Sequence, residues 1–350
     1  MNSDHSRVFG HTSDGKEITE FILRNRRGTE MRIINYGCTI TSLSVEDREG
    51  RFDNIVLGYD NLEEYMLSKE YAGSVIGRYA NRIEKGKFSI GNKQYEVSIN
   101  HNGHHLHGGN IGFDKIVWDA SSVENENGLG IDFFYMSKDG EEGYPGNLNL
   151  GVRYFLSHEN AVIFNYSAIT DQKTIINLTQ HSYFNLNGWK ENILSHQLQI
   201  NANYFLPVDR ELIPTGEIKH VENSAFDFRE RTEIGGNMNF DDSQLTLAKG
   251  FDHNFVLQKM GEELSLAATL YDPISGRTME VHTSEPGIQL YTGNHLEGIT
   301  KISGMKRPYS GLCLETQHFP DSPHHSNFPS VELHPDESFQ STTILLFSAK

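Results

Sequence analysis

The sequence predicts an all-β fold, one large antiparallel β-sandwich with very few short helices. Short β-type runs recur from one end of the chain to the other, and most are bounded by Gly, Asn, Asp or Pro. Helical periodicity is scarce, and the 32 glycines serve turns in such a chain. Because large sandwiches often exceed the usual domain length, we expect a single domain over residues 1–350.

The expected strands follow one another in chain order, each a short apolar or alternating run. They cover residues 18–23, 31–36, 39–45, 54–57, 152–156, 161–168, 174–178, 198–200, 264–270, 288–291 and 342–347. Residues 88–97 predict a hairpin, since Gly91 and Asn92 supply a tight primed turn between alternating strands. Asn61 to Leu67 predicts one short helix. The polar stretch from Ser121 to Gly130 is expected to be an exposed loop.

Composition limits the classes of molecule that the protein is expected to bind. The formal net charge of -17 speaks against nucleic acid and against an anionic membrane surface, so we expect a small, weakly charged molecule as substrate. The two cysteines, Cys38 and Cys313, form no disulfide framework, which indicates a cytoplasmic protein. Neither a secretory signal nor an apolar run of roughly 18 residues is seen. We therefore expect a soluble chain that is a monomer or a homodimer.

A lone carboxylate lies inside an apolar, strand-like run near the C-terminus. Alternation places Leu312 and Leu314 on one face of the strand, and Cys313 and Glu315 on the other. Burial there would favour the protonated carboxyl group and raise its pKa towards the range of a general base. Taken alone, a hydrogen-bonded structural glutamate explains Glu315 equally well.

Histidines stand out at two places. His181 follows an apolar strand and precedes aromatic residues that could wall a pocket, and its imidazole can exchange a proton at neutral pH. Four histidines lie between residues 101 and 107, where an H-x-H pair would suit a metal. No carboxylate follows soon, however, and the glycines after His107 favour a side chain that reaches into a pocket where backbone comes close.

Three further segments carry hydrogen-bonding side chains beside strand ends or glycine turns. Residues 77–83 contain Asn81 and Arg82, which offer fixed donors for hydroxyls and a developing oxyanion. Residues 251–255 and 287–294 contain Asp252 and Gln289, each flanked by aromatic residues, a combination that suits a pyranose ring. Ordinary surface or turn positions remain the alternative for each segment taken singly.

Together, these segments resemble the aldose 1-epimerase (galactose mutarotase) family, in the family's order. The matching pieces are GRYANRI at 77–83, HLHGG at 105–109, GFDK at 112–115 with Trp118, HSYFNL at 181–186, FDHNF at 251–255, GIQLYTGN at 287–294 and ETQHFPD at 315–321. The resemblance implies a β-sandwich with an open cleft, no cofactor and no metal.

The resemblance also implies residue roles by motif position. It assigns the catalytic base to Glu315 and the catalytic acid to His181, and it assigns substrate-binding positions to Asn81, Arg82, His107, Asp252 and Gln289. Gln180 stands where the family more often has Asn, a change next to the acid that leaves the proton donor in place. Four histidines match no position with a role: His104, His318, His324 and His325.

The implied reaction interconverts the α and β anomers of free aldoses. Glu315 would remove the proton from the C1 hydroxyl while His181 protonates the ring oxygen, and the same groups act in reverse after rotation about the C1–C2 bond. Three alternatives stay open: a glycoside hydrolase or lyase that uses Glu315 and Asp252, a non-catalytic sugar-binding module, and an epimerase acting on hexose 6-phosphates.

Overall fold

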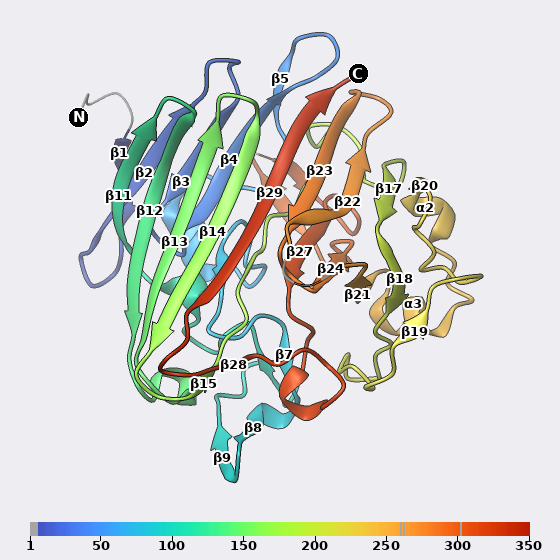
Figure 1. Ribbon diagram of the computed structural model, residues 1–350. Coiled ribbons are helices and arrows are strands. Elements are labelled where there is room, and N and C mark those ends of the chain that lie inside the picture. Colours follow the sequence, from blue (N-terminus) through green and yellow to red (C-terminus); the bar gives the residue numbers. More distant parts are fainter. Residues whose placement is uncertain (1–5, 260, 262, 302) are drawn as a thin grey trace.

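A nine-stranded antiparallel sheet extends across the molecule in the computed structural model, which describes residues 6–259, 261, 263–301 and 303–350 (Figure 1). Its strands alternate between side chains buried against the core and side chains facing outward. In spatial order they are β11 (Asp119–Asn125), β12 (Gly128–Ser137), β13 (Leu148–Ser157), β14 (Ala161–Thr170), β29 (Phe339–Ala349), β23 (Arg277–Thr283), β22 (Ser265–Tyr271), β17 (Gln197–Ile200) and β20 (Thr232–Glu233).

Two five-stranded sheets complete the sandwich, and the large hydrophobic core draws on all three sheets. The first sheet lies behind β11 to β14 in Figure 1 and consists of β1 (Ser6–His11), β2 (Glu17–Arg24), β3 (Glu30–Ile34), β4 (Thr39–Glu46) and β5 (Phe52–Asn54). The second consists of β19 (Lys219–His220), β18 (Ala202–Phe205), β21 (Asp252–Leu257), β24 (Gly287–Tyr291) and β27 (Cys313–Gln317). The predicted all-β sandwich is therefore confirmed.

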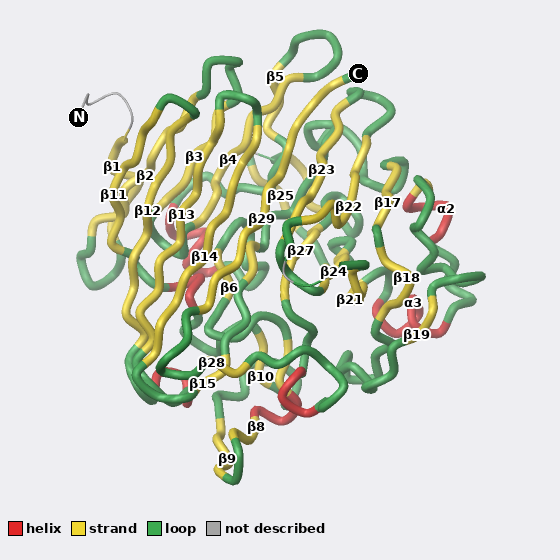
Figure 2. Tube along the Cα trace, viewed as in Figure 1, coloured by secondary structure: helices red, strands yellow, loops and turns green. Residues whose placement is uncertain are grey.

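Five short strand pairs lie outside these sheets. They are β6 (Val75–Ile76) with β16 (Thr179–Gln180), β7 (Arg82–Ile83) with β10 (His105–Leu106), β8 (Lys87–Ile90) with β9 (Lys93–Glu96), β15 (Thr174–Ile175) with β28 (Glu332–Leu333), and β25 (Gly298–Thr300) with β26 (Gly304–Lys306). Figure 2 shows how little of the chain is helical. The α-helices are α1 (Leu62–Leu67), α2 (Ile234–Asn237) and α3 (Ser243–Ala248). None of the helices in the described ranges has the length and apolar character needed to cross a membrane.

Two local predictions are confirmed. The helix expected near residue 61 is α1, and its N-terminus is capped by Asn61, whose side chain accepts the backbone N–H of Glu64. The expected hairpin is β8 and β9, joined by the two-residue turn in which Gly91 has a φ of 58°. Both signals are local, because capping and turn chemistry involve residues only a few positions apart.

The prediction of an exposed loop from Ser121 to Gly130 is wrong. These residues form the end of β11 and the start of β12, paired from Ser121 with Asp132 to Asn125 with Gly128. β11 is an edge strand with no buried position, so its polar sequence does not show the alternation of a half-buried strand. The organisation as one domain over residues 1–350 stays a prediction.

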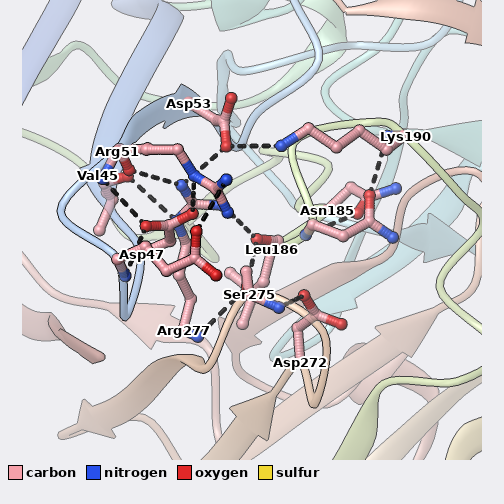
Figure 3. Close-up of polar contacts among 12 residues, drawn as sticks. Val45, Asp47, Arg51, Asp53, Asn185, Leu186, Lys190, Asp272, Ser275 and Arg277 are labelled. Atoms are coloured by element: carbon pink, nitrogen blue, oxygen red, sulfur yellow. Dashed lines mark hydrogen bonds and ion pairs between the residues drawn. The ribbon is translucent and has the colours of Figure 1, made fainter. Parts of the chain in front are cut away.

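A buried arginine ties three regions of the sandwich together (Figure 3). Arg277, which is fully buried at the start of β23, donates to the carbonyl groups of Val45, Arg51 and Leu186 at 2.9 to 3.0 Å. Its Nη2 also lies 2.9 Å from Oδ2 of Asp53. Leu186 is the last residue of the segment 181–186, which begins with His181. The hydrogen bond from Arg277 therefore holds the end of this segment against β23.

Candidate active site

Three neighbouring strands of the second five-stranded sheet place polar side chains on one face. The register pairs Asn254 of β21 with Gln289 of β24, and Gln289 with Glu315 of β27. Because side chains alternate along a strand, Asp252 and Cys313, each two residues away, lie on the same face. Residues more than 60 positions apart in the chain thus form one polar surface.

His181 is brought to this surface by backbone pairing. An isolated antiparallel bridge joins Phe184 to Leu312, and when this register is continued it sets His181 opposite Glu315. The Nε2 atom of His181 lies 3.8 Å from Oε2 of Glu315, and both side chains are buried. The structure therefore brings together the two residues that the sequence paired as acid and base.

The backbone of His181 is held firmly. Its N–H donates to the carbonyl of Ser74, and its own carbonyl accepts the N–H of Gly73, both at 2.9 Å. Gln180 donates from Nε2 to the carbonyl of Gly73 and accepts the N–H of Ser182. The residue that departs from the family pattern therefore braces the strand end that carries His181.

Arg82 and Asp252 form a second polar group beside the pair. Nη2 of Arg82 lies 3.5 Å from one carboxylate oxygen of Asp252, and Nε2 of Gln289 donates to the other at 2.7 Å. Asn81, with a φ of 63°, accepts the N–H and Nη1–H of Arg82 on its side-chain oxygen. Arg82 and Asp252 are thus held in fixed orientations before any ligand binds.

His107 reaches the same place from the loop after β10, with a φ of 50°. The glycine that follows is required there, because a Cβ on Gly108 would lie 1.7 Å from the carbonyl oxygen of Gly77. The expectation that backbone comes close at these glycines is confirmed. The His107 ring lies 5.2 Å from that of His181, centroid to centroid.

Two imidazoles and a carboxylate are a donor set that some metals accept, and their ligand atoms lie within 4.8 Å of one another in His107, His181 and Glu315. However, Nδ1 of His107 accepts the backbone N–H of Asn81 at 3.1 Å. The neutral ring must therefore carry its proton on Nε2, and a protonated nitrogen is no ligand. This geometry suits a hydrogen-bond donor towards a substrate better than a metal ligand.

Burial changes the protonation of the central pair. It raises the pKa of Glu315 well above its ordinary value, the charge of Asp252 raises it further, and Arg82 opposes both. It lowers the pKa of His181 to about 4. These opposite shifts favour one shared proton held on the carboxyl group of Glu315.

These side chains line one cavity of about 730 Å³. Of the seven predicted site residues, six lie along it: Asn81, Arg82, His107, His181, Asp252 and Glu315. Gln289 does not; it lies behind Asp252 in a small separate void that Asn254 also lines. Direct contact between Gln289 and a ligand therefore stays a prediction, and its visible contact is the hydrogen bond to Asp252.

Sequence reasoning missed Tyr71, whose ring lies 4.7 Å from that of His107. It follows α1 in a left-handed conformation, outside every strand, so no periodic pattern marks it. Tyr183 and Tyr291 also line the cavity, and both lie inside quoted motifs, where the aromatic letters were the available signal.

The four histidines without an assigned role have structural contacts. His104 accepts the N–H of Lys85, and His318 lies 2.6 Å from the buried carboxylate of Glu285. His324 and His325 both pair with Asp321. None of the four lines the cavity.

Comparison with known proteins agrees with this geometry. The family model described as Aldose 1-epimerase matches residues 20–346. A galactose mutarotase of Mus musculus is 46% identical over 345 residues, with 97% of each chain covered, and an aldose 1-epimerase of Escherichia coli is 35% identical, with 96% and 97% covered.

A solved structure described as galactose 1-epimerase from Lactobacillus acidophilus superposes with a TM-score of 0.87 at 32% identity, covering 98% of both chains. A homologue from C. elegans gives 0.86 at 27% identity, covering 94% of this chain and 98% of its own. Sequence and structure agree over almost the whole length, and the chain belongs to the aldose 1-epimerase family.

Proposed function

We propose that the protein interconverts the α and β anomers of free aldoses such as glucose and galactose, with Glu315 as general base and His181 as general acid. The observation that carries the proposal is the buried pair formed by Nε2 of His181 and Oε2 of Glu315, 3.8 Å apart and facing one large cavity. The named relatives, a galactose mutarotase and an aldose 1-epimerase, support the same chemistry.

The proposed reaction begins when the pair adopts its charged form, a carboxylate and an imidazolium. This form holds the same single shared proton as the neutral pair. Glu315 then removes the proton of the C1 hydroxyl, His181 protonates the ring oxygen, and the C1–O5 bond opens to the aldehyde. After rotation about C1–C2, the acid and base act in reverse and close the other anomer. No water or covalent intermediate is needed.

The neighbouring residues are proposed to bind the sugar. Arg82 and the Nε2–H of His107 donate towards the oxygens of the reacting centre, where negative charge develops. Asn81 and Asp252 bind hydroxyl groups, and Gln289 orients Asp252 through its hydrogen bond of 2.7 Å. All five side chains are already held by protein contacts, which reduces the cost of ordering them around the substrate.

The structure favours this reading over glycoside hydrolysis. A hydrolase needs a second carboxyl group free to act on the bond, whereas both oxygens of Asp252 are engaged by Arg82 and Gln289. A module that only binds sugar would have no need for the buried pair of His181 and Glu315. The high identity to enzymes named for anomer interconversion points the same way.

Polarimetry of freshly dissolved α-D-glucose and α-D-galactose tests the proposal. The wild-type protein is expected to accelerate the approach to anomeric equilibrium, and Glu315→Gln and His181→Gln are each expected to slow it by roughly 100-fold or more. His334→Gln, at a half-buried histidine that does not line the cavity, serves as the matched control. A wild-type rate equal to that of buffer alone, for several aldoses, would refute the function.

We further propose that the protein acts in the cytoplasm on free monosaccharides, as a monomer or homodimer, and binds no nucleic acid. The net charge of -17 supports the last point, since phosphate backbones require cationic surfaces. Cys38 and Cys313 are both free and buried, as suits a reducing compartment. Fractionation and size-exclusion chromatography test location and assembly.

A further inference from the structure

A buried thiol contacts the proposed acid on the side away from Glu315. The sulfur of Cys313 lies 3.6 Å from Nδ1 of His181, and both side chains are buried. The contact follows from the register that sets His181 opposite Glu315, because Cys313 is two residues before Glu315 on the same face of β27. The two ring nitrogens of His181 therefore have different partners.

The position of each partner determines which nitrogen transfers the proton. His181 and Glu315 both line the cavity, and Nε2 is the ring nitrogen that faces Glu315, so we take it as the nitrogen that exchanges a proton with the sugar. An imidazolium that gives up its Nε2 proton keeps the one on Nδ1, and that proton needs an acceptor. Within the described part of the chain, the side-chain atom that hydrogen bonds with Nδ1 is the sulfur of Cys313. The backbone of His181 also hydrogen bonds with its own ring and raises the pKa of the imidazole, so the sulfur is the side-chain partner beside that backbone contact.

We propose that Cys313 is a positioning residue for His181: its sulfur accepts the Nδ1–H and so keeps Nε2 as the nitrogen that transfers the proton. This inference rests on the proposed function, because it concerns the acid of that reaction. Cys313 itself touches no substrate, since it does not line the cavity.

A neutral sulfur suits this place better than a carboxylate. A carboxylate on Nδ1 would stabilise the imidazolium and weaken it as an acid, whereas a neutral thiol orients the ring without adding charge. Burial raises the pKa of Cys313 well above its ordinary value, so the thiol stays neutral. The sulfur and the burial of the ring therefore both keep His181 a strong acid.

Other groups that face His181 contribute to its environment but approach differently. Ring centroids lie 5.9 Å away in Tyr71, 5.2 Å in His107 and 5.1 Å in Tyr183. Asp252 acts on the imidazole only through its charge. The titratable groups around the ring are thus Tyr71, His107, Tyr183, Asp252, Cys313 and Glu315.

The test compares Cys313→Ala with Cys313→Ser, and uses Cys38→Ala as matched control. Cys38 is also a free, fully buried cysteine, and it is not part of the site. Cys313→Ala is expected to lower kcat about 10-fold with KM nearly unchanged, and to shift the pH profile of kcat, because the ring loses its orienting partner. Serine, a neutral polar acceptor, should restore most of the rate. Cys38→Ala should keep the wild-type rate and pH profile.

A second readout needs no turnover. The side-chain ¹⁵N spectrum of histidine-labelled protein, with His181 identified by the signal lost in His181→Gln, is expected to show Nδ1–H and a bare Nε2 in the sugar-free wild type near neutral pH. Cys313→Ala should mix the two tautomers, while thermal unfolding checks that the fold is intact.

Three results would overturn the inference: a Cys313→Ala enzyme with wild-type kcat and pH profile, a wild-type ring protonated on Nε2 alone, or equal losses for alanine and serine with Nδ1–H retained in both. If the wild type fails to accelerate mutarotation, the proposed function falls, and the ¹⁵N measurement still decides the contact.

Discussion

The carboxyl group of Glu315 lies in an environment that disfavours its charge. Oε2 has no hydrogen-bond partner among the described residues, and burial raises its pKa well above the ordinary value of 4.5. A raised folded-state pKa means that stability present below pH 4.5 is lost as the pH rises through that pKa. Glu315→Gln, which stays neutral, is therefore expected to raise Tm at pH 8 by about 2 °C or more and to change it little at pH 5.

Glu285 provides the control of opposite sign. It is equally buried, but although burial raises its pKa, the charge and hydrogen bond of His318 lower it below the ordinary value. Its ionised form therefore stabilises the fold, and Glu285→Gln should lower Tm at pH 8. If both substitutions shift Tm in the same direction at pH 8, the assignment for Glu315 is wrong.

At this scale the sequence was informative because chemistry is concentrated in short motifs. Residue types and neighbours mark Glu315 and His181 as candidates, the family resemblance assigns them the roles of base and acid, and the structure brings them together. The position of Gln289 behind Asp252 could not be predicted, because it depends on which of two adjacent voids a side chain enters. Tyr71 lay outside every pattern, since a left-handed residue after a helix has no periodicity to read.

The loop after β10 depends on a glycine for steric reasons. Gly108 has a φ of 87°, and an added Cβ would lie 1.7 Å from the carbonyl oxygen of Gly77. Gly108→Ala is expected to displace His107 and to cost about 3 kcal/mol or more in unfolding free energy, with most activity lost. Gly103→Ala is the matched control, because its φ is 86° and nothing lies within 4 Å, so only about 1 kcal/mol is expected. Urea unfolding and polarimetry of both variants test this, and equal losses would contradict it.

Helices and strands could be predicted where the signal lies in neighbouring residues of the sequence, and could not where it depends on pairing with a distant segment. Alternation revealed β27 and β24, and turn chemistry revealed the hairpin of β8 and β9. The polar sequence of the edge strand β11 predicts a loop, because pairing with β12, rather than a pattern of its own, makes this segment a strand. The bridge from Phe184 to Leu312, which aligns the acid with the base, joins residues 128 positions apart and has no signature in one sequence.

The sandwich as a whole depends on Arg277, whose guanidinium joins β23 to the ends of β4 and β5 and to the segment after His181 (Figure 3). Arg277→Met would remove the hydrogen bonds of a buried guanidinium to the carbonyl groups of Val45, Arg51 and Leu186 and to Asp53. The carbonyl groups of Leu186 and Arg51 would keep their second donors, Ser275 Oγ–H and the Asp47 N–H, and we expect the loss to cost about 3 kcal/mol. Arg153→Met removes an exposed pair with Asp132 and should cost less than about 1 kcal/mol. Denaturant unfolding measures the unfolding free energy of both variants. If Arg277→Met changes it by no more than Arg153→Met does, the contacts of Arg277 are not needed for stability.

Buried histidines should make the whole molecule sensitive to acid. Burial lowers the pKa of His105, His181 and His253 from 6.5 to about 4. Between these values the unfolded chain binds protons that the folded chain does not, so stability present above pH 6.5 is lost as the pH falls towards 4. Each group should contribute on the order of 1–2 kcal/mol of loss between pH 7 and pH 5. Urea unfolding at both pH values measures the total loss. His105→Gln should reduce the loss of stability between pH 7 and pH 5 by about 1–2 kcal/mol, because glutamine does not titrate, whatever the stability of the variant at pH 7. His220 is exposed, so His220→Gln should leave the loss unchanged. An unchanged loss in His105→Gln would show that this buried ring takes up its proton in the folded state.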